Sequence, residues 1–195
     1  MKKAKKGLLL VLCAVLLVGA TIAGTVAYLT STTEVVNNTF TAGNVKITLD
    51  EAPVDLYGEV VTGDRRTANE YKLIPGHEYT KDPTVHVAAD SEDCWLFVKI
   101  TDEIADIQDE KTIADQLAEK GWSPVTGTTN VYAYKDIVAA GTNVVVFESF
   151  KIKGDAAVSS YVGKTITVQA YAVQSDGFAS AQDAWTAAPA TWTTN

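Results

Sequence analysis

The stretch CWLFVKIT, from Cys94 to Thr101, decides the fold class of this chain. Every second residue from Cys94 to Ile100 is apolar, and these residues would share one face of a strand. The alternate residues, from Trp95 to Thr101, would share the other face, which changes from aromatic to polar along the strand. A period of two with β-branched and aromatic residues is typical of a strand packed against a core. The stretch therefore predicts a β-rich domain.

Similar patterns recur on both sides of this stretch. Turn residues separate them, among them Pro75-Gly76, Gly141 and Asp176-Gly177. Many short strands of this kind favour an all-β fold, and we predict an antiparallel jelly-roll β-sandwich. The other predicted strands are Asn44–Leu49, Thr84–Ala88, Val131–Lys135, Val144–Lys153 and Thr165–Gln174.

One or two short helices are inserted among these strands. Residues Thr112–Lys120 place apolar side chains on one helical face, with Asp109 or Thr112 as the cap at the start and Gly121 at the end. A second short helix is predicted over Ala179–Ala187.

The first 27 residues have the layout of a secretory signal peptide. A basic patch in residues 1–6 precedes a charge-free stretch, residues 7–33, that begins with leucine and valine. Small side chains at Thr25 and Ala27 predict cleavage between Ala27 and Tyr28. An N-terminal signal-peptide helix therefore precedes the folded domain, and the protein is expected to be secreted. The charge-free stretch is also long enough to span a bilayer, so an uncleaved anchor is the alternative.

Length and charge limit the domain organisation and the partners. The chain has 195 residues and a net charge of −8; without the four lysines of residues 1–6 the charge is 12 − 24 = −12. Such an acidic body disfavours nucleic acid as a partner. No composition break demands a second domain, so we divide the chain into the signal peptide (1–27), an N-terminal leader (28–43), one β-sandwich domain (44–186) and a mobile tail (187–195).

Few residues carry a pattern that indicates chemistry. His77 lies in a predicted turn, and His86 lies on the outward face of its predicted strand, without any HExxH, HxxEH or CxxC motif. We interpret both as solvated surface histidines, and a metal site that uses His77 and His86 is the weaker alternative. Cys94 is interpreted as a buried thiol that packs as a small apolar residue. Five carboxylates from Asp102 to Glu110 are interpreted as a solvated loop. No catalytic residue and no cofactor is predicted.

Three stretches resemble the TasA/camelysin family of exported proteins from Gram-positive bacteria. The first joins GTVAYLT (residues 24–30) with NTFTAGNVKITLDE (38–51), and it is similar to the cleavage region and first strand of precursors processed by the signal peptidase SipW. The second joins LIPG (73–76) with KDPTV (81–85). The third, TVQAYAVQSDGF (167–178), is similar to the final strand of many clostridial members.

This resemblance implies a jelly-roll fold, export with SipW as a processing partner, and a structural role in the extracellular matrix or at the cell surface. It also implies self-association into fibres, or association with other matrix proteins, by donor-strand exchange. The candidate donor strand is Tyr28–Phe40, and Val35, Val36 and Phe40 are its candidate assembly residues. A leader that does not pair is the alternative.

Two other functions remain open. Camelysin is described as a metalloendopeptidase, so the resemblance also implies an enzyme, although this chain has no recognisable zinc motif to receive that activity. The third function is that of a monomeric binding module at the cell surface. We predict that the chain is not an enzyme.

Overall fold

Antiparallel strands dominate the part of the chain that the computed structural model describes, residues 44–109 and 111–188. These residues belong to one unit, which spans residues 42–195. The predicted all-β class is confirmed, because every strand pair is antiparallel and helices are few. The predicted signal peptide, the leader that holds Val35, Val36 and Phe40, and residues 189–195 lie outside the described residues. Within the described part, no helix has the length and apolar character needed to cross a membrane.

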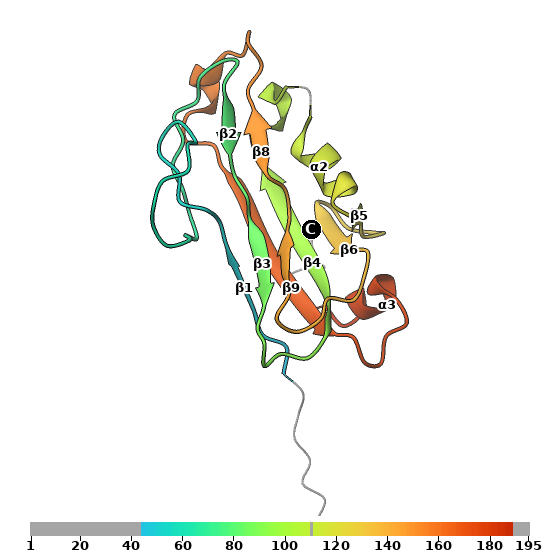
Figure 1. Ribbon diagram of the computed structural model, residues 1–195. Helices are drawn as coiled ribbons and strands as arrows, with labels where there is room; N and C mark the ends of the chain where they lie inside the picture. Colours follow the sequence, from blue (N-terminus) through green and yellow to red (C-terminus); the bar gives the residue numbers. More distant parts are fainter. Residues whose placement is uncertain (1–43, 110, 189–195) are drawn as a thin grey trace, which may run out of the picture. The chain divides into compact units, whose positions relative to one another are not determined.

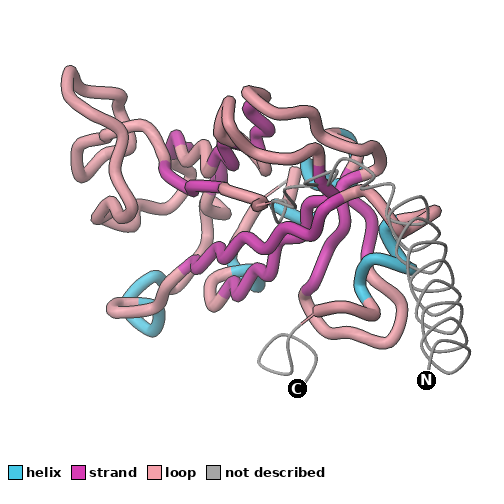
Figure 2. Tube along the Cα trace, turned by 90° about the horizontal axis from the view of Figure 1, so that it is seen from below, coloured by secondary structure: helices cyan, strands magenta, loops and turns pink. Residues whose placement is uncertain are grey.

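The strands of the described residues are β1 (Ile47–Asp50), β2 (Glu78–Thr80), β3 (Thr84–Val87), β4 (Cys94–Asp102), β5 (Trp122–Pro124), β6 (Val131–Tyr134), β7 (Asn143–Val145), β8 (Ser149–Lys151) and β9 (Ile166–Gln174). They form a three-stranded sheet with the order β1-β3-β7, a two-stranded sheet β2-β8, and a four-stranded sheet with the order β5-β6-β4-β9 (Figure 1). Figure 2 shows the strands running through the middle of the unit, with loops projecting around them.

The three-stranded sheet continues into the two-stranded sheet through an irregular segment. Residues 81–83 connect β2 to β3, and residues 146–148 connect β7 to β8. The backbone N–H of Val146 donates to Pro83 O at 2.8 Å. Pro83 has no N–H to donate in return, and Val146 and Phe147 are both buried, so alternation fails at this point. The single strand predicted over Val144–Lys153 is therefore wrong, and the structure divides it into β7 and β8.

The other predicted strands are present, with shifted ends. The predicted strand Asn44–Leu49 begins only at Ile47, because the backbone N–H of Lys46 donates to the hydroxyl of Ser91 instead of to a strand. Strands β2 and β5 were not predicted, since three residues are too few to display a period of two.

Two hydrophobic cores lie on the two faces of β4. The main core contains Leu96 and Val98 of β4 together with Val85 of β3 and Phe150 of β8, so it lies between the four-stranded sheet and the other two sheets. The second core lies on the opposite face of β4. Its buried residues are Trp95, Phe97, Val125, Val131, Val173, Ala184 and Trp185.

The helices are short. In chain order they are the 3-10 helix η1 (Ala105–Ile107), α2 (Ile113–Glu119), the 3-10 helix η2 (Val158–Tyr161) and α3 (Ala181–Trp185). The two predicted α-helices are confirmed, each shorter than predicted. Thr112, and not Asp109, caps α2, because its side chain accepts from the N–H of Asp115 and the Asp115 carboxylate accepts from the N–H of Thr112.

Candidate functional site

Strand β9 has a free edge. It pairs with β4 over its full length, and no described strand pairs with its other side. The N–H of Ile100, which is the partner of Val168, donates to Asn130 at 2.9 Å on the side away from β9. Ile100 and Val168 therefore form a non-hydrogen-bonded pair, and the N–H and C=O of Val168 point toward the free edge. The same geometry applies to every second residue of β9, including Ala170 and Ala172.

The same residues of β9 leave the main core partly uncovered. Ile166, Val168, Ala170 and Ala172 are only half-buried, and they pack against the main core. On the neighbouring sheet, β1 carries half-buried apolar residues in the same way, including Leu49. The seam between β1 and β9 therefore combines unpaired backbone groups with incompletely buried apolar side chains.

A groove with a volume of about 980 Å³ lies beside the N-terminal part of this edge. Residues 66–73 form one wall, and residues 161–168 form the other. Apolar side chains of Leu49, Ile104 and Phe150 contribute to its lining. A groove of this size is at the upper end of the range for binding pockets, and its open strand edge suits an extended chain.

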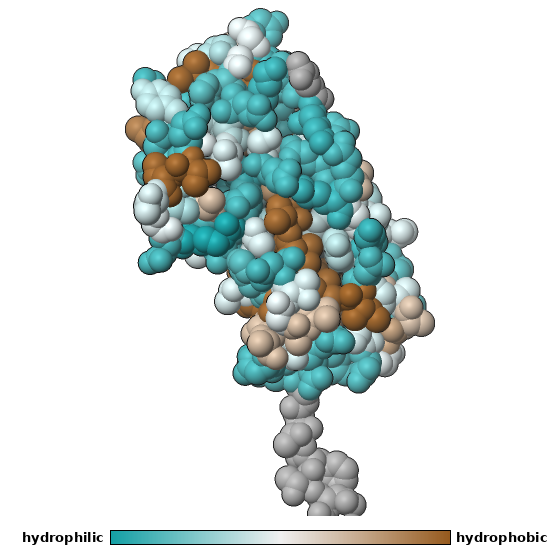
Figure 3. Space-filling view, viewed as in Figure 1, coloured by the Kyte–Doolittle hydropathy of each residue, from teal (hydrophilic) through white to brown (hydrophobic). Residues whose placement is uncertain are grey.

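Large apolar side chains are exposed around the groove. Leu56 and Val162 line it and are 50% and 82% exposed, and Tyr57, Val60 and Val61 are exposed near Leu56 in the sequence. Figure 3 shows apolar atoms over the loop of residues 51–74, at the left of the view, on a face that is largely hydrophilic. Clustered exposed apolar residues of this kind indicate an interaction surface.

A turn holds this apolar loop against β2. Asp55 accepts hydrogen bonds from the N–H groups of Tyr57 and Glu59. Gly58 has φ +79°, and a Cβ at this position would lie 2.7 Å from the Cα of Tyr79. The close approach fixes the backbone of the turn against Tyr79, so that the exposed side chains are presented from a defined position.

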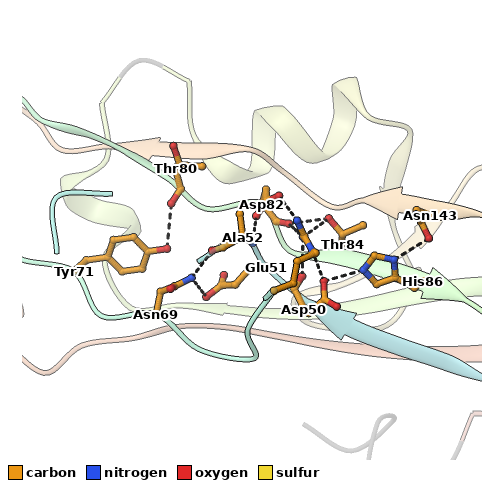
Figure 4. Close-up of polar contacts among 11 residues, drawn as sticks. Asp50, Glu51, Ala52, Asn69, Tyr71, Thr80, Asp82, Thr84, His86 and Asn143 are labelled. Carbon is orange, nitrogen blue, oxygen red and sulfur yellow. Dashed lines mark hydrogen bonds and ion pairs between the residues drawn. The ribbon is translucent and has the colours of Figure 1, made fainter. Parts of the chain in front are cut away.

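Arg65 links the far end of the same loop to β1 and β3, through partners that Figure 4 labels. Its guanidinium donates to the carboxylates of Asp50 and Asp82, and to the hydroxyl of Thr84 at 2.9 Å. Burial alone would raise the pKa of Asp50, but hydrogen bonds from Arg65 and His86 hold that pKa below its ordinary value. The carboxylate of Asp50 is therefore the charged centre of this network.

A buried ion pair lies in the lining of the groove. Lys81 Nζ donates to Glu51 Oε2 at 2.6 Å, and the side chains of the two residues are 10% and 6% exposed. The amide of Asn69 donates to Glu51 Oε1 at 3.0 Å and to Ala52 O at 2.8 Å (Figure 4). The amide oxygen of Asn69 accepts from the N–H of Val54. Asn69 therefore joins the groove wall to the ion pair and to the loop.

The two histidines have separate partners. His77 Nε2 lies 2.8 Å from Tyr57 O. His86 lies between Asp50 Oδ1 and Asn143 Oδ1, each 2.8 Å from a ring nitrogen (Figure 4). Both side chains thus take part in protein contacts that the interpretation as solvated histidines missed. Within residues 44–109 and 111–188, no group of three or more His, Cys, Asp or Glu side chains is placed to hold a metal ion.

Two other residues singled out from the sequence are buried or half-buried. Cys94 is a free, fully buried thiol, as interpreted, and burial together with the nearby Asp93 raises its pKa to about 11. The interpretation of residues 102–110 as a solvated acidic loop is wrong for Asp102, which is partly buried. Burial raises the pKa of Asp102, and its carboxylate accepts hydrogen bonds from Ile104 N–H and from the amide of Gln108.

Comparisons of the chain with protein-family models, curated proteins and solved structures found no match. The resemblance of the three stretches to the TasA/camelysin family therefore stays a prediction. The groove and the free edge of β9 are the features of the described residues that bear most directly on function.

Proposed function

We propose that this chain is an exported structural protein of the extracellular matrix or cell surface, and that its copies associate by strand donation. In this proposal, residues 28–43 of one copy occupy the groove of a second copy and pair with the free edge of β9. One observation carries the proposal: Val168 and its alternate neighbours offer unpaired backbone groups beside a groove with an apolar lining. Backbone hydrogen bonds would supply affinity, and alternate side chains would supply register.

The sequence of the leader suits this role. Residues 28–43 contain no proline and one charge, that of Glu34. In an extended strand Val36 and Phe40 lie on one face, and this face would complete the half-buried row that begins at Ile166 and Val168. Burial of two such side chains stabilises a complex by about 1.5–3 kcal/mol each.

We also propose that the sheets are connected as in a jelly roll, that the chain belongs to the TasA/camelysin family, and that SipW cleaves it between Ala27 and Tyr28. Sequencing the N-terminus of secreted material tests export directly: we expect Tyr28 as the first residue, and an intact Met1 in the membrane fraction would contradict processing.

Deletion of the donor segment tests the assembly. We expect the exported protein to form oligomers or fibres in sedimentation velocity and electron microscopy, and the variant without residues 28–40 to remain monomeric. Unchanged assembly after the deletion would reject strand donation. A wild-type protein that is monomeric at every concentration would favour the surface binding module.

A further inference from the structure

The ammonium group of Lys81 has unused hydrogen-bonding capacity in the groove. It carries three N–H donors, and its only hydrogen-bond acceptor among the described residues is Glu51 Oε2, while Nζ lies over the face of the Tyr71 ring, 5.8 Å from the ring centroid. Lys81 is 9% exposed and Glu51 is 4% exposed, so water has little access to either charge. A buried cation with unmatched donors is costly, and an additional acceptor would lower that cost.

This polar group interrupts an apolar surface. Glu51, Lys81 and Asn69 line the same groove as Leu49, Ile104 and Phe150. An occupant that was apolar throughout would cover the ion pair and leave the remaining N–H donors of Lys81 without an acceptor. An occupant with one polar side chain between apolar ones would fit both parts of the lining.

The leader has this pattern on one of its two faces. In an extended strand Val36, Asn38 and Phe40 share a face, so an amide stands between two apolar side chains. The opposite face presents Val35, Asn37 and then a threonine, and it lacks an apolar residue on the second side.

We propose that the Lys81–Glu51 pair sets the register of strand donation by binding Asn38 of a second copy of this chain. The inference rests on the proposed function. The carboxamide oxygen of Asn38 accepts from Lys81 Nζ, while Val36 and Phe40 cover the apolar parts of the groove. A shift by two residues brings Val36 or Phe40 to the ion pair, where neither can accept a hydrogen bond, so the pair disfavours that register. A shift by one residue brings Asn37 to the pair but replaces Phe40 with Thr39, so the apolar part of the groove disfavours it. A single buried polar contact fixes register in the same manner in coiled coils.

Two matched variants of the exported protein test this assignment. Asn38→Val and Asn37→Val change the composition identically, but they alter opposite faces of the strand. We expect Asn38→Val to weaken self-association about 10- to 100-fold, which is the loss of one hydrogen bond to a charged group. Asn37→Val should change self-association by less than about threefold. Sedimentation velocity over a concentration series measures both effects.

A double variant examines the groove side of the contact. Lys81→Met combined with Glu51→Leu removes both charges, and in this background we expect Asn38→Val to assemble at least as well as Asn38 does. Thermal unfolding of the double variant serves as the check that it folds. If Asn38→Val and Asn37→Val act alike while deletion of residues 28–40 abolishes assembly, the register assignment is wrong and strand donation stands. If the deletion has no effect, strand donation itself is wrong.

Discussion

The substitution Val168→Pro tests the free edge of β9 without disturbing the pairing of β9 with β4. The N–H of Val168 points away from β4, so Val168→Pro removes no hydrogen bond of the β4–β9 ladder. Proline is tolerated on an edge strand when its missing N–H faces outward. The variant therefore removes one donor from the proposed interface and places a ring where an incoming strand would approach.

The size of the effect follows from the hydrogen bonds of the added strand. The lost bond is worth about 0.5–1.5 kcal/mol, and the carbonyl of the incoming strand that stays unpaired adds about 1–3 kcal/mol. A sum of roughly 1.5–4.5 kcal/mol corresponds to self-association that is about 10- to 2000-fold weaker. Sedimentation velocity measures this change, and circular dichroism with thermal unfolding reports on the fold.

Val168→Ala is the matched control. It keeps the N–H but removes more of the side chain, so an effect of packing alone would be at least as large in this variant. We expect Val168→Ala to assemble more strongly than Val168→Pro. The reasoning about the edge is refuted if a folded Val168→Pro assembles as the wild type does.

Three further predictions concern the folded unit itself. The pKa of Asp50 is lower in the folded protein than its ordinary value of 3.8, so its carboxylate stabilises the fold above that pH, and this stability is lost as the pH falls through the folded pKa. Asp50→Asn should therefore lower the unfolding free energy at about pH 6 and converge with the wild type in strong acid, and parallel curves in denaturant titrations would contradict this. Because burial raises the pKa of Cys94 to about 11, iodoacetamide at about pH 8 should label the thiol only after denaturation, and rapid labelling of native protein would show that the thiol is accessible. Gly58→Ala places a Cβ 2.7 Å from the Cα of Tyr79 at φ +79°, so it should destabilise the protein by more than about 1 kcal/mol in thermal unfolding, and an unchanged transition would mean that the turn relaxes freely.

Much of the fold could be predicted because its signal is local. The alternation of Cys94–Thr101 predicted β4, and Thr112 was one of two predicted caps of α2. The strand predicted over 144–153 was wrong because its break depends on Pro83, a partner far away in the sequence. Sequence periodicity alone holds no information about such a partner.

The groove was not predicted, because its residues come from separate parts of the chain. Glu51 and Lys81 are 30 positions apart, and each occurs in a short polar context typical of a loop. Asn69 has no motif that indicates its three hydrogen bonds. The free edge of β9 depends on strand order, which one sequence does not determine. The third stretch of the resemblance does, however, overlap β9 itself.

Hydrogen exchange of the β9 amides tests the central claim most directly. In the monomer, the amides of Gln169 and Tyr171 point toward β4 and should exchange slowly, whereas those of Val168 and Ala170 should exchange rapidly. After assembly we expect slow exchange at Val168 and Ala170 as well, and no such change in the variant without residues 28–40. Rapid exchange at these two amides in the assembled protein would contradict strand addition at the β9 edge.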